Sequence, residues 1–364
     1  MANKPRVIWY NVVFLVLTPI LATILVPLYI WQNGFNWWYL ALFAIAFSFS
    51  NMSITSGYHR YFSHRSYDTH PAVAWLYLFV ASGAFQGSAL QWSTDHRRHH
   101  LEVDTEGDPY SINKGFWFAH VIWMFREDPH PQARNYAQDL NQNHWIRLQH
   151  RYYLWIASFV GFVIPGLAAW ACGLDFWGGV LFGGLLRIVC TQHSTFLINS
   201  AAHKFGRQTY TDKYTARDNL ILAFFTFGEG YHNFHHSFQA DYRNGLHWYQ
   251  WDPTKWWIEI LALVGLARRL KRARIEDIMK ARLAMEERLL VARGASSERV
   301  TQLKLRVEEA QKTLRSLRDS YQLAKDDFNT RSRNWKRMMR AEIRMAEIEF
   351  RSAYCQWRTF QRAI

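Results

Sequence analysis

The stretch that decides the fold of this chain is His96-Arg97-Arg98-His99-His100, and its spacing returns at His232-Asn233-Phe234-His235-His236. A helix turns by about 100° per residue, so the three histidines of each stretch fall within roughly 100° of arc and their imidazoles can point one way. Chance is a poor explanation for two such clusters in a chain with 16 histidines among 364 residues. We interpret both as parts of one metal site.

A third cluster, His59-Arg60-Tyr61-Phe62-Ser63-His64, comes earlier in the chain. His59 and His64 are five residues apart, about 140° around a regular helix. They therefore either bind different metals or lie on the two sides of a helix end. Asn199 and His203 share one helix face at a spacing of four. A structural zinc needs only about four ligands, so this set indicates two metals with four or five ligands each. The candidate ligands are His59, His64, His96, His99, His100, His203, His232, His235 and His236, with Asn199 as a tenth, direct or through water.

Four long apolar runs predict membrane-spanning helices, at residues 8–31, 37–57, 152–172 and 176–200. Lys4, Arg6, Arg60 and Arg65 flank the first pair of runs, which predicts that these ends lie in the cytoplasm. Four spans then place both termini and all three histidine clusters on that side. The apolar stretch 72–90 is interrupted by polar residues and glycines, so we expect it to lie in the membrane interface or against the spans.

Composition agrees with an all-α membrane protein. The formal net charge is +14, and no nucleic-acid-binding signature accompanies it, so anionic lipid is the expected partner of the basic residues. Aromatic residues make up 17% of the chain, which suits membrane interfaces. The three cysteines are scattered and predict no disulfide framework.

The chain changes character near residue 271, which predicts a membrane domain at 1–270 and a helical arm at 271–364. Apolar residues from Val300 to Phe328 recur at steps of three and four, typical of a coiled-coil seam, and a second phase from Trp335 to Phe360 indicates a stutter after Phe328. The segment 293–297 predicts a turn between a shorter and a longer helix. The arm is interpreted as an oligomerisation or partner-binding element, or alternatively as an intramolecular hairpin packed within its own chain.

Imidazole ligands suit iron, zinc, copper or nickel alike, so the choice of metal depends on context. An interfacial site beside a membrane-buried pocket suits a di-iron centre that activates O2 on a lipid chain. Carboxylates are expected to orient the imidazoles. The candidates are Asp95, Asp104, Asp108 and Glu229.

Four motifs carry a family resemblance. They are His59-Arg60-Tyr61-Phe62-Ser63-His64-Arg65-Ser66-Tyr67, Asp95-His96-Arg97-Arg98-His99-His100, Asn199-Ser200-Ala201-Ala202-His203 and Gly228-Glu229-Gly230-Tyr231-His232-Asn233-Phe234-His235-His236-Ser237-Phe238. Over residues 36–270 the chain resembles the membrane fatty acyl desaturases of the stearoyl-CoA desaturase type.

The resemblance implies a four-helix membrane domain whose cytosolic cap holds two iron ions. The nine histidines match the family's metal ligands position by position, and Asn199 matches the water-mediated one. The implied reaction is an O2-dependent desaturation that leaves a cis double bond, most often at Δ9. Its electrons come from a separate donor of the ferredoxin or cytochrome b5 type with its reductase. Trp92 and Phe196 fall at tunnel-lining positions, where Phe196 replaces a tryptophan, and Phe47 and Asn51 fall at the closed end of the acyl tunnel.

Departures from the family pattern leave the acyl carrier open. Gly87 and Thr94 stand where animal members have an asparagine and an arginine that contact the CoA headgroup. Acyl-CoA, an acyl carrier protein or an intact phospholipid therefore remain possible substrates. Two other functions are weighed: a related histidine-box hydroxylase, and a non-enzymatic membrane scaffold built around the arm.

Overall fold

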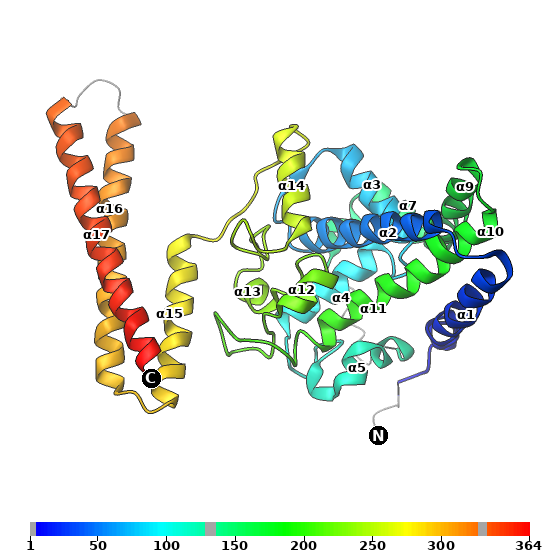
Figure 1. Ribbon diagram of the computed structural model, residues 1–364, viewed down its shortest axis with the longest axis horizontal. Coiled ribbons are helices and arrows are strands. Elements are labelled where there is room, and N and C mark those ends of the chain that lie inside the picture. The colour runs from blue at the N-terminus through cyan, green and yellow to red at the C-terminus, as the bar shows by residue number, and fades with distance from the viewer. Residues whose placement is uncertain (1–4, 128–135, 327–332) are drawn as a thin grey trace. The chain divides into compact units, whose positions relative to one another are not determined.

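The computed structural model describes residues 5–127, 136–326 and 333–364 (Figure 1). The chain divides into two compact units. The first comprises Met1–Gln208 and Lys213–Ala273, and the second comprises Thr209–Asp212 and Arg274–Ile364. Two residues used in the sequence analysis, Lys4 and Phe328, lie outside the described residues.

Four helical segments of the described chain are long and apolar enough to cross a membrane, which confirms the four expected spans. The first is α1 (Trp9–Asn33), and the second is α2 (Trp37–Met52) continued by η1 (Ser53–Ser63). The third joins α8 (Tyr153–Ser158), η5 (Phe159–Val163) and α9 (Ile164–Ala171). The fourth joins α10 (Phe176–Gly179), η6 (Val180–Leu186) and α11 (Arg187–Ser200). The chain is an integral membrane protein by this criterion.

Turn chemistry explains why α1 and α2 form a hairpin. Gly34 follows α1 with φ of 78°, a left-handed conformation that glycine adopts without steric cost. The Asn36 side chain then accepts a hydrogen bond from the Trp38 amide at 2.9 Å and caps α2.

A buried arginine ties the third and fourth spans together. Arg187 donates hydrogen bonds to the carbonyl oxygens of Gly83, Gly161 and Gly183 at 2.7, 3.0 and 3.0 Å. The cation thus faces the protein interior, as expected for a charge within an apolar span, and its role is structural. His193, the histidine of this span, lies 3.0 Å from His120 through ring nitrogens.

The rest of the first unit forms a cap of short elements. One correction concerns the stretch 72–90: α3 (Pro71–Ser82) ends at Ser82, and a new helix, α4 (Ala89–Leu101), begins after the Ser88 cap. Figure 1 shows α4, α12 (Leu220–Phe225) and α13 (His232–Ser237) gathered at one end of α2 and α11. The other cap elements are β1 (Asp68–Thr69), η2 (Ile112–Lys114), α5 (Phe116–His120), η3 (Ile122–Phe125), α6 (Gln138–Asn141), α7 (His144–Arg151), α12 (Leu220–Phe225), α13 (His232–Ser237), α14 (Pro253–Leu263) and β2 (Ala267–Arg268), with β1 and β2 antiparallel.

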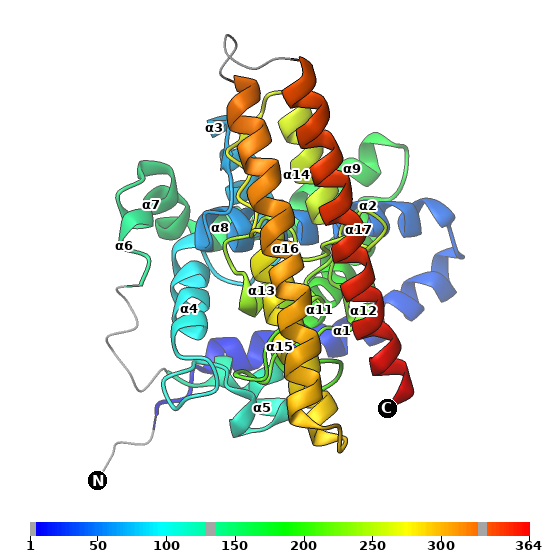
Figure 2. The ribbon, with the colours of Figure 1, turned by 90° about the vertical axis from the view of Figure 1, so that its left-hand side faces the viewer.

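The second unit is a helical arm of α15 (Ile275–Ala292), α16 (Ser297–Asp326) and α17 (Arg333–Ala363). Figure 2 shows α16 and α17 side by side. They are antiparallel, because Arg306 contacts Gln356 while Arg318 pairs with Glu347. The expectation of one continuous helix with a stutter is therefore wrong: the second apolar phase belongs to a separate helix that folds back.

The predicted seam is buried within the arm. Val300, Leu303, Val307 and Ala310 pack with residues of the other two helices, and Trp357 of α17 is fully buried among them. The indole nitrogen of Trp357 donates to Glu286 of α15 at 2.7 Å. This is the hairpin alternative of the sequence analysis, and an intermolecular coiled coil stays a prediction.

Candidate metal centre

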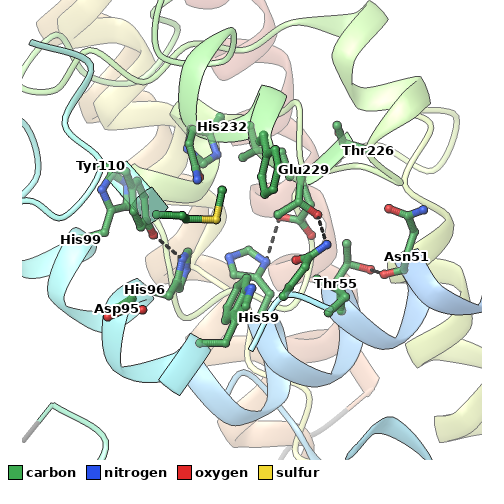
Figure 3. Close-up of a pocket in the computed structure, with 18 of the residues that line it drawn as sticks. Asn51, Thr55, His59, Asp95, His96, His99, Tyr110, Thr226, Glu229 and His232 are labelled. Carbon is green, nitrogen blue, oxygen red and sulfur yellow. Dashed lines mark hydrogen bonds and ion pairs between the residues drawn. The ribbon is translucent and has the colours of Figure 1, made fainter. Parts of the chain in front are cut away.

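Nine histidines of the first unit converge in two groups. Within each group the ligand nitrogens lie within 4.8 Å of one another. The first group comprises His59, His64, His96, His100 and His235, and the second comprises His99, His203, His232 and His236. Figure 3 shows His59, His96, His99 and His232 pointing toward one cavity. The nine histidines expected from the sequence are thus all brought together.

A π-helical turn resolves the placement of His59 and His64. Hydrogen bonds in a π-helix run from residue i to i+5, and the His64 amide donates to the His59 carbonyl at 3.1 Å. Residues five apart therefore come to the same side, and η1 ends at Ser63, between the two. Both imidazoles lie in the first group, which favours the alternative in which the helix ends between them.

The two His-x-x-His-His helices each serve both groups. In α4, His96 and His100 belong to the first group, whereas His99 belongs to the second. In α13 the pattern reverses, because His235 joins the first group while His232 and His236 join the second. The three imidazoles of each stretch therefore do not share one target, and their arc of about 100° is wide enough to reach two ions.

The distances between Nε2 atoms fit a bound ion in each group. Metal–nitrogen bonds of about 2.0–2.1 Å place two ligands at right angles about 3 Å apart. The closest pairs are His64–His96 at 2.8 Å, His100–His235 at 2.9 Å, His59–His235 at 3.0 Å, His203–His232 at 3.0 Å and His232–His236 at 3.1 Å. Imidazole nitrogens at these separations are compatible with a shared cation in each group.

Burial in the cap favours the uncharged form of four of these imidazoles, those of His96, His100, His203 and His236. Burial, followed by repulsion from neighbouring histidines, lowers the pKa of His96, His100 and His236 well below the usual value. Burial lowers the pKa of His203 to about 3. Because a histidine must be neutral to bind a metal, the site presents ligands in their competent form.

Two carboxylates orient ligands directly. The Nδ1 of His99 lies 2.9 Å from Asp108 Oδ1, and the Nδ1 of His59 lies 2.9 Å from Glu229 Oε2 (Figure 3). A partner at Nδ1 fixes the tautomer and leaves Nε2 for the metal. Burial opposes ionisation of Asp108, but the nearby His99 holds the pKa of this carboxyl below its usual range. Both acids are where the sequence analysis expected them.

A third carboxylate acts through an intermediate hydroxyl. Asp104 accepts hydrogen bonds from the Thr215 amide and the Thr215 hydroxyl, both at 2.7 Å. The Thr215 hydroxyl oxygen in turn lies 2.8 Å from His203 Nδ1, from which it accepts. We refer to these three residues as the His203 relay. Thr215 was missed because a threonine 12 residues beyond a ligand carries no sequence signal.

Glu229 is itself held by a buried ion network. Arg60 donates to Glu229 Oε1 at 3.0 Å and to Asp252 Oδ1 at 2.9 Å, and all three side chains are almost fully buried. Arg60 was counted as a flanking charge for membrane orientation, and its burial removes it from that argument. Arg6 and Arg65 remain.

A cavity joins the histidines to the membrane-spanning helices. It is lined by ligands of both groups, His59 and His96 with His99 and His232, and by apolar residues of the spans such as Ile54. The expected residues Asn51, Trp92, Asp95, Phe196 and Asn199 also line it, and the Trp92 ring stacks on His96 at 4.8 Å. Phe47 is not among the lining residues. It lies one turn before Asn51, whose amide donates to the Phe47 carbonyl.

The fold and the site together define a class: a helical membrane protein with two groups of histidines that could each hold a metal ion, beside a partly apolar cavity. Comparison with known proteins identifies the family, because the fatty acid desaturase family matches residues 35–263. The chain belongs to this family.

Named relatives cover much of the chain. A probable acyl-CoA desaturase of Schizosaccharomyces pombe is 42% identical over 68% of this chain and 52% of its own length, and acyl-CoA desaturase 1 of Saccharomyces cerevisiae is 42% identical over 66% and 48%. An sn-1 stearoyl-lipid 9-desaturase of Anabaena variabilis is 32% identical over 75% of this chain and 97% of its own length. The chain thus spans about half the length of the two yeast relatives and almost all of the cyanobacterial one.

Proposed function

We propose that this protein is a fatty acyl desaturase that introduces a cis double bond into a saturated acyl chain. One observation carries the proposal: a single cavity is lined both by histidines of the two metal groups and by apolar side chains of the spans. An acyl chain bound along those side chains would bring a mid-chain methylene pair to the metal centre.

The reaction removes two hydrogen atoms from neighbouring methylenes and forms one carbon–carbon double bond. One O2 is reduced to two waters, which takes those two hydrogens together with two protons and two further electrons. Metal ions held by the nine histidines would supply the O2 chemistry, and iron is the metal we propose. The protein residues orient the ligands through Asp108, Glu229 and the His203 relay, and Trp92 and Phe196 confine the chain.

Several further features of this function are proposed on evidence other than the shared lining of the cavity. Asn199 lines the cavity and is proposed as a tenth ligand, direct or through water. A Δ9 position and an acyl-CoA or acyl-lipid substrate follow the names of the relatives. A separate ferredoxin-type or cytochrome b5-type donor with its reductase is proposed as the source of the electrons. Arg6 and Arg65 favour a cytoplasmic location for the cap and for both termini.

The proposal is tested by gas chromatography–mass spectrometry of total fatty acids from cells that express the chain with an electron donor. The wild type should produce a new mono-unsaturated acid, whose fragmentation gives the position of the bond. His99→Ala removes a ligand of the second group and the partner of Asp108, so its product should fall to the background level.

The matched control is His144→Ala, which removes an exposed histidine of α7 outside both groups and should leave the product unchanged. A product that gains one oxygen atom instead of losing two hydrogens would show the hydroxylase alternative. Equal fatty acid profiles for wild type and His99→Ala, with iron-loaded protein, would contradict an enzymatic role and leave the scaffold alternative.

A further inference from the structure

Positive charge in the arm is concentrated on one helix. α17 carries eight arginines or lysines against three glutamates. α15 carries three basic against four acidic residues, and α16 carries seven against five. The excess therefore belongs to α17 and is not spread evenly over the arm.

The outward face of α17 combines this charge with apolar side chains. Arg337, Arg344 and Arg351 are exposed and recur every seven residues, so they form one row along the helix. Met338, Met345 and Ile348 lie beside the row with exposed fractions of 53%, 66% and 60%. We call these six residues the α17 outer face. The opposite side, with Met339, Ala346, Ala353 and Trp357, is buried against the arm.

The acidic residues of α17 avoid this face. Glu347 pairs with Arg318 of α16, and Glu342 and Glu349 lie about 130–150° of arc from the centre of the arginine row and Ile348. Among the described residues, no ion pair within 4.0 Å neutralises Arg337, Arg344 or Arg351. The face thus joins uncompensated positive charge to exposed apolar surface, the combination found in helices that lie on membranes.

We propose that the α17 outer face docks on an anionic lipid surface, with the arginines at phosphate groups and the methionines and Ile348 among the upper acyl carbons. The covalent link supports this occupant: the arm is joined to a chain that spans a bilayer, so lipid is always at high effective concentration. A symmetric contact with a second copy would oppose like charges. An acidic protein partner would be attracted by the same arginines, but it lacks the constant proximity that the spans give to lipid, and the experiment below includes it as an outcome.

The full-length protein offers its own probe position. Cys355 is exposed on α17, four residues beyond Arg351, on the same side of the helix. With Cys172→Ser and Cys190→Ser, an environment-sensitive fluorophore on Cys355 reports contact with lipid. The protein is placed as single copies in nanodiscs of neutral phosphatidylcholine or of phosphatidylcholine with phosphatidylglycerol.

Docking should shift the emission to the blue in anionic discs and not in neutral discs, and high salt should reverse the shift. Each basic residue at such a surface is worth about five-fold in binding. The variant Arg337→Glu, Arg344→Glu and Arg351→Glu should therefore weaken docking by roughly 100-fold or more. The control is Arg299→Glu, Lys312→Glu and Lys325→Glu, an equal charge change on exposed positions of α16, which should retain the shift.

Equal emission in neutral and anionic discs would overturn the proposal. So would an equal loss in the α16 control, because the effect would then reflect net charge alone. A shift that appears only when an acidic protein is added, or only with two copies per disc, would assign the face to those partners instead.

Discussion

At the scale of single residues, the candidate metal centre depends on side chains outside the set of nine histidines. Asp108 and Glu229 lie 2.9 Å from ligand imidazoles, whereas Asp104 reaches His203 only through the Thr215 hydroxyl. The relay sets a direction for the proton: the carboxylate accepts from the hydroxyl, so the hydroxyl must accept from His203 Nδ1. The Nε2 atom of His203 then carries no proton, and its lone pair is available to bind the ion.

The relay gives a residue-scale prediction. Thr215→Val keeps the shape of the side chain but removes the hydroxyl, so it should lower metal affinity by about 10–100-fold. The measurement is metal content per protein after dialysis against a graded chelator. Thr215→Ser keeps the hydroxyl and should retain affinity near the wild-type value. If the valine variant binds metal as tightly as the serine variant, the relay does not position His203.

Much of the site could be predicted from residue type and spacing, and the remainder could not. The nine histidines and the roles of Asp108 and Glu229 follow from motif chemistry. The division of each histidine stretch between two groups does not, because it depends on where α4 and α13 pack. Thr215, Arg60 and Asp252 were missed for the same reason: their partners are brought close only by the fold.

At the scale of elements, the sequence predicts where helices exist better than what kind they are. The four spans were placed within a few residues, because apolar runs of that length have few alternatives. The π-helical turns of η1, η5 and η6 were not anticipated, since their signal is not periodic. In the arm, steps of three and four describe a seam but not its partner, so the return of α17 onto α16 could be given only as an alternative.

The position of Phe47 on α2 gives an element-scale prediction about the length of acyl chain that the protein prefers. Phe47 lies one turn before the cavity-lining Asn51 and contacts Phe227 with ring centroids 5.9 Å apart. We expect Phe47→Ala to open space beyond Asn51 and to shift products toward longer acyl chains, measured by feeding acids of graded length. Phe49→Ala, which alters an exposed side chain of the same helix, should not change the preference. An unchanged chain preference in both variants would exclude Phe47 from length selection.

At the scale of the whole molecule, we propose that the two compact units are two domains, and that the first carries the metal site without the second. All nine histidines and their carboxylate partners belong to the first unit. A chain that ends after Ala273 should therefore keep its metal content and its desaturation product. Its subunit number, measured by light scattering, should equal that of the full chain, because the apolar seam is already buried within the arm. A lower subunit number after truncation would restore the oligomerisation role.

The way in which α4 and α13 share their ligands between the two histidine groups has a consequence for the order in which metal ions bind. Each of these helices contributes ligands to both histidine groups, so an ion in one group fixes the rotation of two helices that also present ligands to the other. Binding of the first ion therefore includes the conformational entropy lost on ordering both helices. The second ion binds to helices that are already ordered, so it binds more tightly. Metal occupancy should behave as a single cooperative step. Under scarcity of metal, a population of these molecules would divide into filled and empty members, with few half-filled ones between them.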